Sequence, residues 1–74
     1  MSGNEISELA GLADRLVREQ ERRRITGVSR STAWRLERRG EFPRRRAITA
    51  HSVGWSAVEL HQWVKARPII GGVP

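Results

Sequence analysis

The sequence contains no cysteine and no tyrosine, and it has only one phenylalanine and one lysine. The lack of cysteine excludes disulfide bonds, iron–sulfur clusters and cysteine-ligated zinc. The two histidines, His51 and His61, are too few to form a metal site on their own. Because apolar runs extend over only a few residues, no segment has the length of a membrane-spanning helix. We therefore expect a protein that works without a metal, a cofactor or a membrane.

The chain has 74 residues and a mass of 8.4 kDa, which allows one small domain. A core of this size typically supplies only about 3–5 kcal/mol of stability. Residues 1–14 carry three acids and lack the basic start and apolar stretch of a secretory signal. We accordingly expect a cytoplasmic protein from a bacterium or a virus.

The net charge of +6 is distributed unevenly along the chain. Residues 1–14 carry a local charge of −3, residues 15–46 carry +8 from twelve arginines and four glutamates, and residues 47–74 carry +1. Thirteen of the fourteen basic residues are arginine, whose planar guanidinium grips phosphates and guanine edges bidentately. A solvated basic face is the simpler interpretation. The clustering and the arginine bias instead favour a polyanionic partner, and nucleic acid in particular.

Residues 19–26 have the charge order of a short helix. Acidic side chains lie at its start and arginines near its end, which complements the helix dipole and permits an ion pair between Glu19 and Arg23. Gly27 then permits the positive φ of a tight turn. The preceding residues 16–17 could form a short extended segment.

A second helix is predicted over residues 30–39, with Gly40 at its end. Val28 precedes it as a buried anchor, and Ser29 can cap it by accepting a hydrogen bond from a backbone N–H. A narrow apolar inner face and a basic outer face are what an element inserted into a DNA groove requires. The inner face holds Ala33, Leu36 and Glu37, and the outer face holds Arg30, Ser31, Trp34, Arg35 and Arg38.

Two short strands are predicted over residues 44–48 and 53–55, with a turn over residues 49–52 between them. The turn lacks the Asn-Gly pair of a tight two-residue hairpin. Gly54 suits a bulge or a close approach of two backbones.

A third helix is predicted to begin at Ser56, which forms a capping box with Glu59, and to end before Pro68. Its apolar residues recur at helical spacing and give it one buried edge. The predicted core of the domain consists of Val28, Ala33, Leu36, Trp55, Leu60, Trp63 and Val64.

The two ends of the chain are separate units in this interpretation. Residues 1–14 form either a mobile arm or a short amphipathic helix over about residues 5–13. Residues 15–67 form the domain, and residues 68–74 form a short apolar tail.

Helix, glycine turn, basic helix, two-stranded hairpin and helix together make a winged helix-turn-helix. This fold is mostly α, with three to four short helices and a small β-hairpin wing. Residues 28–40, VSRSTAWRLERRG, are followed by EFPRRR and then by SVGW. With the preceding ITG turn and the closing helix around Trp63, this pattern over residues 15–67 resembles the AlpA family of phage-type regulators and excisionases. It is similar, more distantly, to the MerR-like winged-helix group.

The resemblance implies that the second helix enters the major groove of double-stranded DNA. Ser31 and Arg35 would then face base edges. The hairpin would lie against the adjacent minor groove or the backbone, with His51 and Ser52 near its tip. Phosphates or the groove walls would be held by Arg30, Thr32, Arg38 and Arg39, and the phosphate chain at the base of the hairpin would be flanked by Arg44, Arg45 and Arg46.

Some members of this DNA-binding set also have simpler interpretations. Ser29 is a helix cap first and a phosphate contact second. Trp34 is more simply a packing residue at the edge of the helix than a base-stacking one, and His51 is more simply a solvated turn residue. We expect no enzymatic activity, because no general base with an orienting acid accompanies the serines.

One departure from the family pattern concerns Arg22 and Arg23, where relatives usually have apolar or small residues. Either the turn is less tightly packed than usual, or the arginine stems cover apolar surface while their charged heads stay in water. In both cases Ile25 is the only clearly apolar side chain of the first helix.

By resemblance, the chain is an excisionase-type recombination directionality factor of a mobile element, located in the bacterial nucleoid. It would bind repeated sites, bend the DNA and bias a partner integrase, a tyrosine recombinase, towards excision. Ile69 and Ile70 would make head-to-tail contacts between protomers on DNA, although the tail could also fold back or be disordered. A transcriptional activator of an integrase or excision gene is the close alternative. A basic protein-interaction module and an RNA-binding protein are remoter ones, the latter because few aromatic residues are free to stack on bases.

Overall fold

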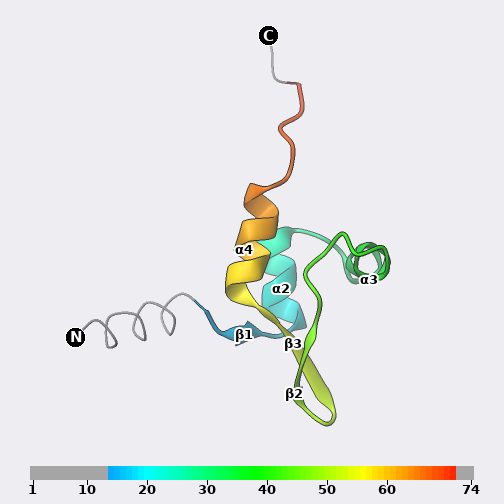
Figure 1. Cartoon of the computed structure of the whole chain (residues 1–74), viewed down its shortest axis with the longest axis vertical. Coiled ribbons are helices and arrows are strands. Elements are labelled where there is room, and N and C mark those ends of the chain that lie inside the picture. Colours follow the sequence, from blue (N-terminus) through cyan, green and yellow to red (C-terminus); the bar gives the residue numbers. More distant parts are fainter. Residues whose placement is uncertain (1–13, 72–74) are drawn as a thin grey trace, which may run out of the picture.

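The computed structural model describes residues 14–71, which form a winged helix-turn-helix as predicted (Figure 1). The predicted arm or helix over residues 1–14 lies almost entirely outside the described residues. The helices are α2 (Glu19–Thr26), α3 (Arg30–Arg38) and α4 (Ala57–Lys65), and the strands are β1 (Leu16–Val17), β2 (Arg46–Thr49) and β3 (Ser52–Ser56).

The three strands form one antiparallel sheet in the order β1-β3-β2. The short extended segment predicted over residues 16–17 is therefore a strand, and Val17 pairs with Trp55 at the base of the hairpin. Gly54 of β3 lies close to the backbone of Val17 in β1 and to the side chain of Ile48 in β2. A Cβ atom at this position would lie 2.9 Å from the Val17 carbonyl oxygen and 2.9 Å from Cδ1 of Ile48. The predicted close approach at Gly54 is confirmed, and a side chain there would force the sheet apart.

The helix-turn-helix has the predicted boundaries, except that α3 ends at Arg38, one residue earlier than expected. Gly27 has a φ of 71°, and its N–H donates to the Arg23 carbonyl at 2.7 Å. The Ser29 hydroxyl accepts a hydrogen bond from the Thr32 N–H at 3.3 Å and thereby caps α3. Helix α2 packs beside α4, whereas α3 stands to one side of this pair (Figure 1).

The amino terminus of α4 is capped twice. The Ser56 hydroxyl accepts from the Glu59 N–H at 3.1 Å, which confirms the predicted cap. The Asp14 carboxylate accepts from the same hydroxyl at 2.9 Å and from the Val58 N–H at 3.3 Å. These hydrogen bonds, first from Ser56 and then from Val58, lower the pKa of Asp14. Asp14, two residues before β1, is thus tied to the last helix of the domain.

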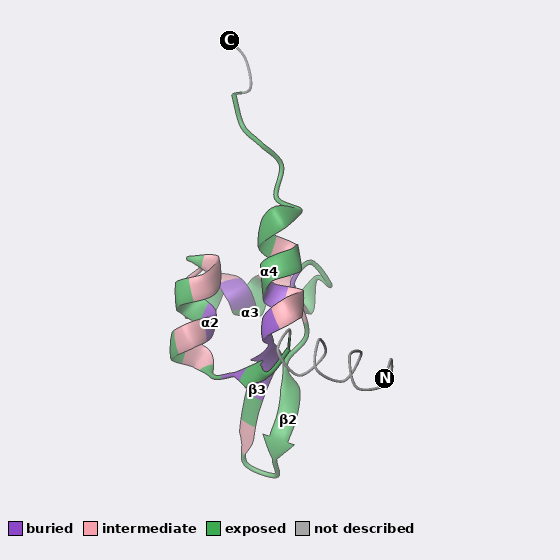
Figure 2. Cartoon of the chain, turned by 90° about the vertical axis from the view of Figure 1, so that its left-hand side faces the viewer, coloured by how far each residue is buried: buried purple, intermediate pink, exposed green. Residues whose placement is uncertain are grey.

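The core differs from the predicted one at its edges (Figure 2). Val64, predicted to be buried, is 38% exposed, because it lies near the end of α4 where the helix extends beyond its neighbours. Phe42 was not predicted but is buried, with its ring edge-on to Trp63 at a centroid distance of 4.9 Å. The buried apolar residues are Val17, Ala33, Phe42, Trp55, Ala57 and Leu60, and the half-buried ones packed on them are Ile25, Val28, Leu36 and Trp63.

Among the described residues, the largest side chain with no solvent exposure is that of Arg22. Its guanidinium carbon lies 5.5 Å from the ring centroid of Trp55 and 5.9 Å from that of Phe42. Of the two interpretations given for this position, the one in which the charged head of Arg22 stays in water is therefore wrong. A guanidinium is weakly hydrated and stacks on aromatic faces, so two rings and a set of hydrogen-bond acceptors can hold it in the core. Its neighbour Arg23 is exposed.

The hydrogen bonds of Arg22 join the turn to the start of α2. Its Nη1 atom donates to the Val28 carbonyl at 2.5 Å and lies 3.4 Å from Oγ1 of Thr26. Its Nη2 atom forms an ion pair with Glu19 at 2.5 Å. The predicted ion pair between Glu19 and Arg23 is not present, because Glu19 pairs with Arg22 instead. A buried guanidinium without a counter-charge is much less stable than an exposed one, which water solvates.

We predict that Arg22→Ala lowers the free energy of unfolding by about 3 kcal/mol, because it deletes a buried cation and leaves its acceptors unpaired. Arg22→Lys keeps the charge but loses the planar fork, so it should also destabilise the domain. Urea denaturation followed by tryptophan fluorescence measures both changes. Arg24→Ala, at an exposed position of the same helix, is the control and should cost less than about 0.5 kcal/mol. Equal costs for Arg22→Ala and Arg24→Ala would refute a structural role for Arg22.

Candidate nucleic-acid interface

An open groove of about 1000 Å³ runs between the start of α2, the outer face of α3 and the tip of the hairpin. Trp55 lies at its base, and the side chains at its rim are mainly polar or basic. The groove is lined by Arg18, Glu19, Gln20, Arg23, Arg30, Ser31, Ala33, Trp34, Arg45, His51, Ser52, Val53 and Trp55.

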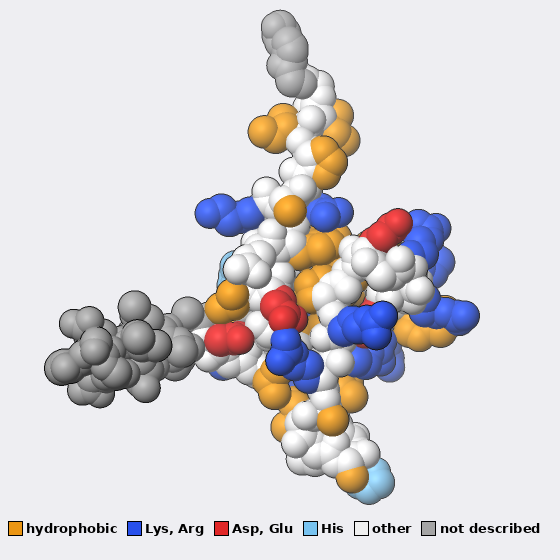
Figure 3. Space-filling view, viewed as in Figure 1, with side chains coloured by type: hydrophobic (Ala, Val, Ile, Leu, Met, Phe, Trp, Pro, Cys, Tyr) orange, Lys and Arg blue, Asp and Glu red, His pale blue; other side chains and the backbone are white. Residues whose placement is uncertain are grey.

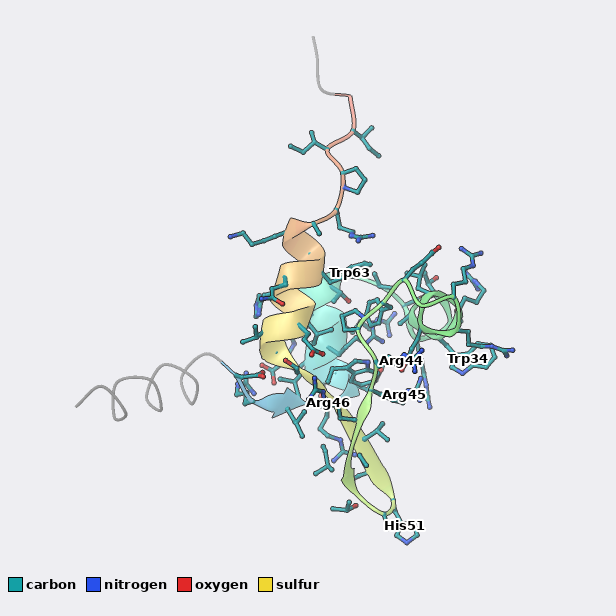
Figure 4. The ribbon with its side chains drawn as sticks, viewed as in Figure 1. Trp34, Arg44, Arg45, Arg46, His51 and Trp63 are labelled. Carbon is teal, nitrogen blue, oxygen red and sulfur yellow. The ribbon has the colours of Figure 1, made fainter. Side chains whose placement is uncertain are left out.

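The groove brings together the outer face of the helix and the hairpin tip, two regions that the sequence predicted separately. Arg30, Ser31 and Trp34 reach it from α3, and His51 and Ser52 reach it from the hairpin. Figure 4 places His51 at the far end of this hairpin. Residues far apart in sequence thus share one concave surface.

Arg18 and Arg23 also line the groove and were missing from the predicted set. Both lie in the segment of highest positive charge. Arg23 is adjacent to the buried Arg22 on the same helix and therefore faces a different direction. No pattern in the sequence indicates that Arg22 points inward, so the place of Arg23 in the groove could not be predicted.

Other predicted residues of α3 lie outside the groove. The Ser29 hydroxyl also donates to Oγ1 of Thr32 at 3.0 Å, so both hydroxyls serve the cap of the helix. Arg35 is exposed, and its Nη2 atom donates to the same Thr32 oxygen at 3.3 Å. Arg39 forms a loose pair with Glu41 at 3.6 Å.

The three arginines at the start of the hairpin, Arg44, Arg45 and Arg46, have three different environments. Arg45 pairs with Glu37 of α3, and Arg46 pairs with Glu59 of α4. Arg44 is exposed and lines a second, smaller hollow of about 330 Å³ together with Trp34, Glu37, Arg38 and Arg45. Figure 4 shows Arg44 and Arg45 between the hairpin and α3.

Glu37 joins α3 to the base of the hairpin. Its Oε2 atom accepts from the Arg45 backbone N–H at 2.8 Å, and its Oε1 atom accepts from Arg45 Nη2 at 2.9 Å and from Nε at 3.1 Å. Burial by itself raises the pKa of Glu37, but the hydrogen bonds from Arg45 outweigh it and lower that pKa below its usual range. An ionised Glu37 therefore holds the helix and the hairpin at a fixed separation at neutral pH.

The arginines give this side of the molecule a positive surface. Figure 3 shows Lys and Arg side chains gathered over α3, with apolar surface among them. Along the outer face of α3, Arg30, Arg35 and Arg38 are all exposed. Such a surface attracts phosphates, and arginine is the side chain best suited to grip them.

The tail residues Ile69 and Ile70 are 90% and 92% exposed, so in this structure they do not fold back onto the domain. The predicted contact with a neighbouring protomer stays a prediction. Within residues 14–71 there is no helix of the length and apolarity needed to cross a bilayer, and no cluster of side chains suited to a metal ion.

Comparison with protein families assigns the chain to a known group. Residues 15–68 match the family described as "Prophage CP4-57 regulatory protein (AlpA)". This chain belongs to the AlpA family. The match covers β1, the helix-turn-helix, the hairpin and α4.

Among curated proteins, the chain is similar to "Uncharacterized protein ORF88" of Enterobacteria phage P4, with 35% identity over 54 residues. The alignment covers 73% of this AlpA-family chain and 61% of the phage protein. No solved structure matches the chain significantly.

We predict that Glu37→Gln lowers the free energy of unfolding by about 1–2 kcal/mol at pH 7, because it removes the charge that Arg45 faces. The pKa of Glu37 is lower in the folded chain than in the unfolded one. Its contribution is therefore present above the unfolded pKa of about 4.3 and is lost as the pH falls through the folded pKa.

Urea denaturation of the parent chain and of Glu37→Gln at pH 7 and at pH 3 measures this effect. The difference in stability between the two proteins should shrink on acidification, because protonated Glu37 resembles glutamine in charge. A difference that is the same at both pH values would contradict the proposed clamp between Glu37 and Arg45.

Proposed function

We propose that the chain is a sequence-specific DNA-binding protein of a mobile element. The observation that carries this proposal is the groove that joins the outer face of α3 to the hairpin tip. A helix-turn-helix places its second helix in the major groove, and the hairpin of this chain would then lie against the adjacent minor groove or the backbone. Membership of a family described as regulatory supports the same conclusion.

The positions of the arginines support different roles for them in this interface: contact with phosphates, contact with bases, and support of the hairpin. Arg18, Arg23 and Arg30 line the groove at its rim and are exposed, so they suit contacts with phosphates. Ser31, Trp34 and Arg35 lie on the outer face of α3, where base edges would be within reach. Arg45 and Arg46 are paired with glutamates, so their first role is to hold the base of the hairpin, and a phosphate contact would compete with that role.

We further propose that the protein acts as an excisionase-type recombination directionality factor. One helix and one hairpin offer a small contact surface, so a single copy should bind weakly, and several copies on neighbouring sites would bind together. Bending DNA costs on the order of 1–6 kcal/mol per site, which several bound copies and an integrase can offset. The chain itself would perform no chemistry, because the integrase breaks and joins the strands.

The domain boundaries fit this role. Residues 15–67 would dock on DNA, and the exposed Ile69 and Ile70 would be available to a neighbouring copy. A transcriptional activator of an integrase gene would use the same docking surface and is the second candidate. The family description as a regulatory protein favours it specifically.

We predict that Arg23→Ala weakens binding to all duplex sequences alike and reduces the slope of log K against log [salt] by about one. Arg24→Ala is the matched control, because Arg24 is exposed on the same helix but does not line the groove. Fluorescence anisotropy with a labelled duplex, measured over a range of salt concentrations, separates the two variants. Equal effects of both substitutions would show that the groove is not the binding surface.

The proposed role is tested by an in vitro excision assay with the integrase of the same element. Addition of the protein should shift the reaction towards excision, and Arg35→Lys should abolish the shift because lysine lacks the bidentate fork. Specific binding to the attachment region without any effect on excision would leave the transcriptional activator as the better candidate. Equal affinity for attachment-site and random DNA at physiological salt would contradict both roles.

A further inference from the structure

We infer that Trp34 and Arg38 act together as a base-reading pair that recognises a thymine methyl group beside a guanine in the major groove. The inference rests on the proposed function and deepens it, because it names the chemical groups that the interface recognises. It also assigns Arg38 to bases, whereas the sequence predicted a phosphate or groove-wall contact for it.

The first observation is the exposure of Trp34. This indole is 48% exposed, whereas Trp55 is 4% exposed and Trp63 is half-buried. A small domain gains stability from every indole that it buries. An exposed indole at the centre of a helix face contributes less to that stability than a buried one would. Figure 4 shows Trp34 on the side of α3 that is turned away from α2 and α4. The expectation that Trp34 is simply a packing residue does not explain this position.

The second observation is the place of Trp34 between two hollows. Trp34 lines both the large groove towards the hairpin and the smaller hollow formed with Glu37, Arg38, Arg44 and Arg45. The indole therefore forms a ridge on the face that would meet DNA. A ridge inserted into the major groove contacts the edges of base pairs, which are the groups that carry sequence information.

The third observation is the position of Arg38 over the indole. Its guanidinium carbon lies 4.6 Å from the centroid of the Trp34 ring. Stacking uses the flat face of the guanidinium and leaves the N–H donors at its edge free. Within residues 14–71, Arg38 makes no ion pair, unlike Arg45 and Arg46, which are held by glutamates. The stack thus orders Arg38 before binding and leaves its donors available to a ligand.

The chemistry of these two side chains selects the bases. The thymine C5-methyl is the apolar group that unmodified base pairs present in the major groove, and an indole edge is an apolar surface. The N7 and O6 atoms of guanine accept two parallel hydrogen bonds from a guanidinium fork. Because Trp34 and Arg38 are one helical turn apart and in contact, they would reach neighbouring base pairs.

The test begins with selection of binding sites from a pool of random duplexes by the full chain and by Trp34→Ala. Trp34→Ala should fold normally, because half of the indole is already exposed, and circular dichroism checks this. The sites selected by the parent chain should share a thymine next to a guanine. The preference for that thymine should be lost from the sites selected by Trp34→Ala.

The decisive measurement replaces this thymine with uracil, which deletes only the methyl group. The parent chain should lose affinity about fourfold, as expected for one buried methyl, and Trp34→Ala should lose none. An equal loss of affinity in both proteins, or no loss in either, would overturn the role of Trp34. If the parent chain still binds its selected sites specifically, the proposed function is unaffected by that result. A chain that selects no sequence at all would overturn the proposed function as well.

The guanine is tested with 7-deazaguanine, which lacks the N7 acceptor. The parent chain should bind this duplex more weakly, and Arg38→Ala should be insensitive to the change because alanine has no donor for N7. Arg67→Ala is the matched control, since Arg67 stacks on Trp63 at 4.2 Å but lines neither the groove nor the smaller hollow that Arg38 lines. If Arg38→Ala discriminates against 7-deazaguanine as strongly as Arg67→Ala does, the assignment of Arg38 to guanine is wrong.

Discussion

The buried guanidinium of Arg22 is the contact on which the arrangement of this domain depends. It lies within 6 Å of the ring centroids of Phe42 and Trp55, which come from the loop after α3 and from the hairpin. Its hydrogen bond to the Val28 carbonyl holds the turn between the two helices. A chain without cysteine and with few aromatic residues thus uses one cation to connect elements that its small apolar core would hold only weakly.

The arginines fall into two groups: some stabilise the fold, and the others lie on the surface. Arg22 belongs to the core, and Arg45 and Arg46 are paired with Glu37 and Glu59 so that the base of the hairpin is held against α3 and α4. The others stay on the surface, where Arg18, Arg23 and Arg30 line the groove. Five of the thirteen arginines form ion pairs with glutamates among the described residues, so the number of arginines alone overstates how many are free for a polyanion.

The sequence predicted the helices and the caps well because these depend on local signals. Gly27, Ser29 and Ser56 act within a few residues of their own position, and the structure confirms all three. Contacts between distant segments were predicted less well. The pairing of Val17 with Trp55 and the burial of Phe42 depend on how the elements pack, which no local pattern encodes.

Arg22 is the clearest case of this limit. The charge pattern of α2 favours a solvated, helix-stabilising arginine, and hydropathy gives no reason to bury it. Only the packed structure brings two aromatic rings and a carbonyl oxygen to the same place. At the candidate site, the outer face of α3 followed from the helical period, whereas the contribution of Arg18 and Arg23 depended on knowing that Arg22 points inward.

The central claim is that the head of Arg22 is a fixed, desolvated part of the core. Nuclear magnetic resonance of the guanidinium groups in the full chain measures this most directly. One arginine side chain, assigned to Arg22, should have resonances shifted by the ring currents of Phe42 and Trp55 and should exchange its protons slowly with water. Arg22 resonances that coincide with those of the exposed arginines and exchange as fast as they do would contradict the account.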